Sequence, residues 1–310
     1  MTRLEDLPLR VVGGHCGLMD DARDGGTAVE LGWRWDPTLY RGSAAHYAKG
    51  RVAYPPELVR LVADELGLNG GQRLLDVGCG PGSLALALAP HFREVIGVDA
   101  DADMLAVAAR WAADHHVHNA RWTCLRAEEM PAELPTADVI AFAQSLHWMD
   151  RLPVLAATRA LLGPGGVVLH VLATTHRGDA PSPRGGARDD SAAPPWEAIL
   201  ALVRSYLGTE PRAGARRLPQ TAGEGAAGVF RSSGFEGPRR LEVPGWVVQR
   251  SEEEVLSAVH SLSGAAPHLF GERLAAFDSD LLSLLSRTSA DGFFVEQMRG
   301  ITVDVWRPTT

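Results

Sequence analysis

A glycine-rich turn between an apolar strand and a helix constrains the fold of this chain more than any other feature. Residues 73–77 read Arg-Leu-Leu-Asp-Val, residues 78–82 read Gly-Cys-Gly-Pro-Gly, and a helical pattern begins at Ser83. Glycines in such a turn let the backbone approach a ligand closely, and the adjoining helix N-terminus offers unpaired N–H donors. The segment predicts a nucleotide-like ligand site, and a tight turn that binds nothing is the alternative.

Strands and helices alternate on both sides of this turn. We expect strands at residues 73–77, 94–98, 121–125, 138–142 and 167–172, and helices at 55–66, 83–89, 101–115 and 153–162. This alternation is typical of a parallel sheet that is covered by helices on both faces. We therefore predict an α/β fold with a Rossmann-like, doubly wound, mostly parallel sheet.

The length of 310 residues would allow about two domains, but the later part of the chain indicates additions to one domain. Helices are expected at residues 196–207, 222–233, 251–262 and 271–286, and strands at 239–243, 293–297 and 301–306. We predict an N-terminal arm (1–42, packing through Trp33 and Trp35), a cofactor-binding core (43–178), a lid insertion (179–222), a core continuation (223–245), a helical substrate lid (246–292) and final core strands (293–310).

Composition excludes several classes of function. The chain has 30 basic and 38 acidic residues and a net charge of -8, whereas a nucleic-acid groove needs clustered positive charge, so we expect no nucleic-acid partner. Three cysteines far apart form no disulfide framework, and the histidine-rich run 114–118 lacks partner ligands, so we expect no metal. No apolar run approaches the ~18 residues of a membrane span. We expect a cytoplasmic protein without a membrane partner.

Asp76 separates two classes of nucleotide-like ligand, because it lies two residues before the first glycine of the turn. A carboxylate there would repel a diphosphate but suits an ammonium or sulfonium group. Ser83 also stands where dinucleotide-binding motifs place their third glycine, and Asp99 ends the next strand, where an acid can accept ribose hydroxyls. These residues favour S-adenosylmethionine over NAD. A nicotinamide oxidoreductase and a non-catalytic adenosyl-binding protein are the alternatives.

Residues 74–82 resemble the glycine motif of class I S-adenosylmethionine-dependent methyltransferases, and residues 97–101 resemble their ribose-binding motif. Residues 126–131 resemble the adenine-contacting loop, and residues 144–150 resemble the type-11 small-molecule subgroup. Upstream, Tyr40, Tyr47, Arg51 and Tyr54-Pro55 resemble an arm that closes over the cofactor. The resemblance covers residues 40–175. It implies a seven-stranded sheet, S-adenosylmethionine as cofactor and S-adenosylhomocysteine as product.

The resemblance also implies the residues that bind the cofactor. They are Tyr47, Arg51, Asp76, Gly78, Gly80, Gly82, Asp99, Ala100, Met104, Ala127, Glu128 and Gln144. Arg51 would pair with the cofactor carboxylate, or else lie on the surface. Because Arg126 stands where many relatives have an acid, the adenine contact is left to Glu128 and the backbone of Ala127. A solvated loop acid is the alternative for Glu128.

His147 follows the fourth expected strand, and a neutral imidazole there is a candidate base for the methyl acceptor. The alternative is that His147 and Trp148 pack the lid. We expect the acceptor to contact Tyr40, His147, Trp148 and Trp196.

The acceptor is expected to be a small molecule, since no N-P-P-Y segment follows the fourth strand. The insertions resemble those of bacterial natural-product methyltransferases, including aminoglycoside N-methyltransferases of the gentamicin pathway. That resemblance favours N-methylation of an amino sugar, with which the net charge of -8 is compatible. O-methylation of a hydroxyl or carboxylate metabolite is the alternative.

Overall fold

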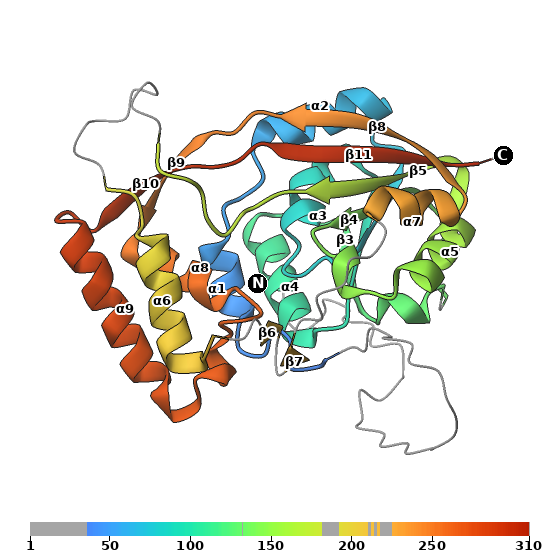
Figure 1. The fold of residues 1–310 in the computed structure, drawn as a ribbon. Helices are drawn as coiled ribbons and strands as arrows, with labels where there is room; N and C mark the ends of the chain where they lie inside the picture. Colours follow the sequence, from blue (N-terminus) through green and yellow to red (C-terminus); the bar gives the residue numbers. More distant parts are fainter. Residues whose placement is uncertain are drawn as a thin grey trace, which may run out of the picture.

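A seven-stranded sheet forms the centre of the structure, a computed structural model that describes residues 36–131, 133–181, 192–209, 212–213, 216–217 and 225–309. The strand order is β3-β2-β1-β4-β5-β11-β8, and Figure 1 shows β5, β11 and β8 side by side at one edge. The strands are β1 (Arg73–Val77), β2 (Glu94–Asp99), β3 (Ala120–Cys124), β4 (Ala137–Ala143), β5 (Leu162–Leu172), β8 (Phe235–Val243) and β11 (Ile301–Pro308). The strands β1 to β5 pair in parallel, and β11 is antiparallel to β5 and β8. The predicted mostly parallel α/β fold is confirmed.

Helices cover both faces of this sheet because successive strand residues point to opposite sides. Leu74 packs in one hydrophobic cluster with α2, α3 and α4, whereas Leu75 packs in another with α5 and α7. These helices are α2 (Pro56–Leu66), α3 (Ser83–Leu88), α4 (Ala102–Asp114), α5 (Arg151–Leu161) and α7 (Ala226–Ser232). Short 3-10 turns lie at η1 (Ala89–His91), η2 (Ala127–Glu129), η3 (Leu146–Trp148), η4 (Pro267–Leu269) and η5 (Gly271–Arg273). A doubly wound arrangement results.

A separate group of elements, which we call the lid, lies beside the N-terminal helix α1 (Ala44–Gly50) in Figure 1. It consists of α6 (Trp196–Leu207), β9 (Val247–Ser251), α8 (Glu252–His260), α9 (Leu274–Thr288) and β10 (Phe293–Gln297). Its buried residues form their own hydrophobic cluster, in which Phe277 and Phe294 are fully buried. Two-residue strands, β6 (Arg212–Ala213) and β7 (Arg216–Arg217), pair with each other elsewhere.

One predicted boundary is wrong, because residues 293–297 are not part of the core sheet. Strand β10 pairs antiparallel with β9 in a two-stranded sheet, and only β11 joins the core. Phe294 explains the difference, since its side chain is buried in the lid cluster. The sequence pattern predicts a strand but not its partner, which is set by tertiary packing.

The other predicted strands of the core lie within one or two residues of their observed positions, apart from residues 167–172 and 239–243, which belong to longer strands. The helix expected from residue 251 opens with a capping box, in which the Ser251 N–H donates to Glu254 Oε2 at 2.7 Å. Trp33 and Trp35 lie outside the described residues. The remaining domain boundaries stay predictions. Within the described ranges, no helix has the length and apolarity to cross a membrane.

Candidate active site

The glycine turn after β1 adopts left-handed backbone angles, with φ of 69° at Gly78, 54° at Gly80 and 82° at Gly82. A Cβ at Gly78 would lie 2.5 Å from Ser145 Cβ, and one at Gly82 would lie 2.7 Å from the Trp122 ring. A Cβ at Gly80 would meet no protein atom within 4 Å. Gly78 and Gly82 therefore allow close packing, whereas Gly80 leaves space open for a ligand.

Two cavities adjoin this turn at the carboxyl ends of β1, β2 and β4, and they share a wall. The first, of about 680 Å³, is lined by nine of the predicted cofactor residues: Tyr47, Gly78, Gly80, Asp99, Ala100, Met104, Ala127, Glu128 and Gln144. The second, of about 390 Å³, adds Arg51 and Asp76. Gly82 lines neither cavity and acts through packing. Eleven predicted residues thus lie around the carboxyl ends of these strands, with Tyr47 and Arg51 coming from α1 and its end.

Asp76 carries the clearest ligand signal of the site. Its side chain is buried, with 1% of the residue exposed, and neither carboxylate oxygen has a hydrogen-bond partner. Burial raises the pKa of Asp76 to about 7, the nearby backbone N–H of Ala85 partly opposes this shift, and the negative charge of Asp99 adds to it. An unpartnered buried carboxylate is costly. Its position beside the second cavity therefore fits a ligand that supplies a cationic donor.

Arg51 provides the opposite charge in the same cavity. Its Nε donates to Ser261 Oγ at 2.8 Å, its Nη2 donates to the Ser261 carbonyl at 3.0 Å, and its guanidinium lies 4.5 Å from the Tyr47 ring centroid. These contacts fix the side chain and leave N–H donors for a ligand, since a guanidinium carries five. A carboxylate and a guanidinium in one cavity match the ammonium and carboxylate of an amino acid.

Asp99 is held in place by backbone donors at the end of β2. Its Oδ2 accepts from the Gly80 N–H at 2.7 Å, and its Oδ1 accepts from the Asp101 N–H at 2.9 Å. Burial raises the pKa of Asp99 to about 6. Asp101 is the N-cap of α4, because its Oδ1 accepts from the N–H groups of Asp103 and Met104. Asp99 is therefore the acid that faces the first cavity.

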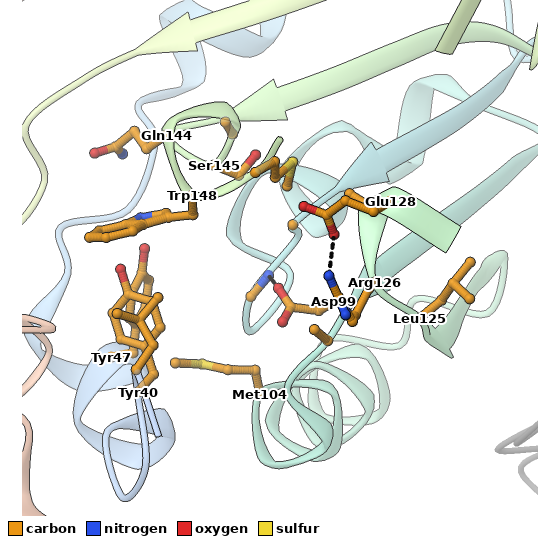
Figure 2. A pocket seen from close by; sticks show the side chains of 17 residues that line it. Tyr40, Tyr47, Asp99, Met104, Leu125, Arg126, Glu128, Gln144, Ser145 and Trp148 are labelled. Atoms are coloured by element: carbon orange, nitrogen blue, oxygen red, sulfur yellow. Dashed lines mark hydrogen bonds and ion pairs between the residues drawn. The ribbon is translucent and has the colours of Figure 1, made fainter. Parts of the chain in front are cut away.

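Aromatic side chains form one wall of the first cavity. Tyr40 contacts Tyr47 and Trp148 edge-on, with ring centroids 6.1 Å apart in both pairs. Figure 2 shows the two tyrosine hydroxyls directed toward Trp148, with Met104 beside the rings. Burial raises the pKa of Tyr40 above its ordinary value, so its hydroxyl stays protonated. This wall keeps water from one side of the cavity.

The opposite end of the first cavity holds Glu128 and Arg126, which form an ion pair with 3.5 Å between Nη2 and Oε2 (Figure 2). Glu128 Oε1 also accepts from the Asp150 N–H at 3.0 Å. With a side chain only 17% exposed, Glu128 differs from a solvated loop acid. Its contact with adenine, together with that of the Ala127 backbone, stays a prediction.

His147 lines neither cavity, although the sequence predicts an acceptor contact there. The residue is exposed, and its ring centroid lies 4.7 Å from that of Trp148. Partial desolvation of the ring, followed by its basic neighbours His170, Arg151 and Arg51, lowers the pKa of His147 below its ordinary value. The imidazole is therefore neutral at pH 7, and its role as a base stays a prediction, because catalytic hydrogen bonds often tighten only in the complex.

Trp196 lines neither of these cavities, and its predicted acceptor contact stays a prediction. Its indole Nε1 donates to Glu296 Oε1 at 2.7 Å. The indole N–H needs a partner when it is buried. Trp196 therefore serves the internal structure of the lid. Among the described residues, no group of three His, Cys, Asp or Glu side chains is placed to hold a metal ion.

Several lining residues are absent from the predicted set: Leu39, Leu125, Arg126, Ala143, Ser145 and Met149 in the first cavity, and Val52, Tyr54, Cys79, Ser83, Leu84 and Thr175 in the second. Tyr54 belongs to the arm pattern, and its hydroxyl accepts from Gln144 Nε2 at 3.2 Å. Gln144 itself has a φ of 56°, a strained angle for a non-glycine residue that often marks functional sites. Leu39 and Thr175 carry no signal in the sequence.

Comparisons with known proteins concern the part of the chain that contains the glycine turn. A family model described as a methyltransferase domain matches residues 74–166. An uncharacterized methyltransferase of Mycobacterium tuberculosis is 34% identical over 134 residues, which are 43% of this chain and 51% of the relative. A Saccharomyces cerevisiae protein, named as a probable S-adenosylmethionine-dependent methyltransferase, is 30% identical over 111 residues, 34% of this chain and 37% of the relative.

The chain thus spans about half the length of the first of these relatives. The crystal structure of the YcgJ protein from Bacillus subtilis is 18% identical, covers 82% of this chain and 99% of its own, and has a TM-score of 0.46. Residues 74–166 thus match a methyltransferase domain, and one of the matched relatives is named as dependent on S-adenosylmethionine. The residues present fit that cofactor, because Asp76 and Arg51 provide the charges that its amino-acid part requires.

Proposed function

We propose that this chain transfers a methyl group from S-adenosylmethionine to a small-molecule acceptor. The unpartnered, buried carboxylate of Asp76 carries the proposal, because it lies beside the glycine turn, where a diphosphate would be repelled. This observation also disfavours a nicotinamide oxidoreductase. The test is incubation with deuteromethyl-labelled S-adenosylmethionine and a panel of acceptors, followed by mass spectrometry. Label in a small-molecule product supports the proposal, and binding without any transfer would leave an adenosyl-binding protein instead.

Each group of predicted residues binds a different part of the cofactor. Asp76 binds the ammonium and Arg51 the carboxylate of its amino-acid part, Asp99 accepts the ribose hydroxyls, and the loop of Ala127 and Glu128 receives the adenine. When bound, S-adenosylmethionine supplies a methyl group that is activated by a sulfonium centre. Tyr40, Tyr47 and Trp148 exclude water from the reaction space and orient the acceptor, and positioning of this kind supplies much of the acceleration of a displacement reaction.

The acceptor that we favour is an amine of an amino sugar or aminoglycoside, in bacterial natural-product biosynthesis and in the cytoplasm. The net charge of -8 is compatible with a cationic acceptor. An amine must also lose a proton, and His147 is neutral at pH 7, as a proton acceptor must be. Turnover with amino sugars or aminoglycosides tests this choice. Methylation of carboxylates or phenols in their place would contradict it.

O-methylation of a hydroxyl or carboxylate metabolite is the second candidate, and one observation favours it. The neighbours of His147 that carry a positive charge at pH 7 are Arg151 and Arg51. Positive surroundings stabilise an anionic acceptor and disfavour an ammonium group. Matched acceptors that differ only in an amine, a hydroxyl or a carboxylate would separate the two candidates. The amine should react fastest if the favoured choice is right.

A further inference from the structure

A buried ion pair inside the lid joins β9 to β10. Arg250 on β9 is 3% exposed and Glu296 on β10 is fully buried, with 3.0 Å between Nη1 and Oε2. Removing two charges from water is expensive, and such a pair persists only where further hydrogen bonds satisfy both groups. The partners of the remaining donors and acceptors therefore show which parts of the chain the pair organises.

Those partners lie in segments that are distant in sequence. Arg250 donates from Nη2 to the Gly50 carbonyl at 2.7 Å and from Nη1 to the His176 carbonyl at 2.9 Å. Glu296 Oε1 accepts from the Gly178 N–H at 2.7 Å, in addition to the Trp196 indole. One ion pair thus holds the end of α1, the segment after β5 and the start of α6.

Two of these segments line the second cavity. Gly50 directly precedes Arg51, and His176 directly follows Thr175, and both Arg51 and Thr175 are lining residues. The segments are also joined to each other, because the Val52 N–H donates to the Thr175 carbonyl at 2.8 Å. The His176 ring reaches Arg51 as well, with 3.5 Å between Nδ1 and Nη1.

Little room exists for Gly50 to move independently. A Cβ at Gly50 would lie 2.2 Å from the backbone of α8 at Ala258. The same helix carries Ser261 directly after its end, and Ser261 holds the Arg51 guanidinium from the other side. Arg51 is therefore fixed between the end of α8 and the two segments that Arg250 holds.

We propose that Arg250 and Glu296 are positioning residues, which set the Arg51 guanidinium to receive the carboxylate at the amino-acid end of the cofactor. The inference rests on the proposed function for the identity of that ligand. Neither residue lines the first or second cavity. Arg250 acts through the backbone carbonyls of Gly50 and His176, and Glu296 acts through Arg250 and the Gly178 N–H. Two lid residues far along the chain thus orient an arginine that lines the second cavity.

The test compares two ligands that differ in the amino-acid part, which is the part that Arg51 would bind. S-adenosylhomocysteine carries the amino-acid group, and 5′-methylthioadenosine lacks it. Arg250→Lys keeps the charge but loses the planar fork that reaches several acceptors. We expect S-adenosylhomocysteine to bind about tenfold more weakly to this variant, a loss on the scale of one charge-assisted hydrogen bond, and methylthioadenosine to bind as before. Glu296→Gln should show the same difference.

Arg240→Lys is the control, since the half-exposed Arg240 forms an ion pair with another buried carboxylate, that of Asp304, and lines neither cavity. It should leave the affinity for both ligands unchanged. An equal loss for both ligands in Arg250→Lys, or no loss for either, would overturn the positioning role. Failure of the unaltered protein to bind S-adenosylhomocysteine at all would instead refute the proposed function.

Hydrogen exchange on the unaltered protein provides a second measurement that needs no variant. S-adenosylhomocysteine should slow exchange at residues 50–52, 176–178 and 250–254 more than methylthioadenosine does, because only the former engages Arg51. Equal protection by the two ligands would contradict the inference.

Discussion

The backbone N–H of Gly80 donates a 2.7 Å hydrogen bond to Oδ2 of Asp99. This bond joins the glycine turn after β1 to the acid at the end of β2, and the Asp101 N–H holds the other oxygen of the same carboxylate. The orientation of Asp99 is therefore set before a ligand arrives, which reduces the entropic cost of binding. The same bond makes Gly80 and Asp99 parts of one site.

Variants of two neighbouring acids, Asp99 and Asp101, should separate an effect on ligand affinity from an effect on the stability of the fold. Asp99→Asn removes the charge that accepts the ribose hydroxyls and should weaken S-adenosylhomocysteine about tenfold or more. Asp101→Ala removes the cap of α4 and should lower the free energy of unfolding by about 1 kcal/mol while leaving affinity unchanged. Calorimetry and chemical denaturation measure the two effects. Similar losses of affinity in both variants would contradict the assignment.

Two glycines allow a test of the open space at Gly80. Gly67, which caps α2, has a φ of 56°, close to the 54° of Gly80, and a Cβ at either position meets no protein atom within 4 Å. Alanine at each should therefore cost a similar ~1–2 kcal/mol of backbone strain. Only Gly80→Ala should also weaken S-adenosylhomocysteine, because only its methyl group occupies the cavities. If Gly67→Ala weakens binding as much as Gly80→Ala does, the loss of affinity in both variants comes from lower stability, and the open space at Gly80 is not a ligand site.

The buried Asp76 should make the ligand-free protein less stable as pH rises. Its pKa is raised from 3.8 to about 7, so between these values the folded state binds more protons than the unfolded state, and stability falls with increasing pH. Asp76→Asn should remove this contribution. Ligand-free Asp76→Asn should thus be more stable than the unaltered protein at pH 8, by about 1–3 kcal/mol, with the difference narrowing toward pH 5. A constant difference across this range would show that Asp76 is ionised throughout.

His147→Ala tests the proposed base. Loss of a general base typically lowers turnover by about 10²-fold or more, and the affinity for S-adenosylmethionine should not change, because His147 lines neither cavity. Turnover and binding should be measured between pH 6 and pH 9, where the unaltered imidazole is neutral. Unchanged turnover over this range would remove His147 from the mechanism and leave it a packing role beside Trp148.

The features that could be predicted from the sequence are those set by residues close together along the chain. The glycine turn, Asp99 at the end of its strand and the Ser251–Glu254 capping box depend on residues a few positions apart, so their patterns are visible without tertiary structure. The sheet then brings the predicted cofactor residues together, because the carboxyl ends of parallel strands meet at one edge.

Long-range contacts explain what the sequence could not predict. The partner of Trp196 is Glu296, a hundred positions later in the chain, and no spacing rule connects them. Residues 293–297 have the alternation of a strand, but the lid cluster around Phe294 decides that they pair with β9. Thr175 reaches the second cavity only because the chain after β5 pairs with Val52.

The central claim is that the cavities beside Asp76 bind S-adenosylmethionine, and calorimetric titration with S-adenosylmethionine and NAD tests it most directly. S-adenosylmethionine should bind and NAD should not. The affinity should rise about tenfold from pH 6 to pH 8 as Asp76 ionises, and Asp76→Asn should remove most of this dependence, leaving the smaller part that comes from Asp99. Tight binding of NAD alone, or equal pH dependence in Asp76→Asn, would contradict the account.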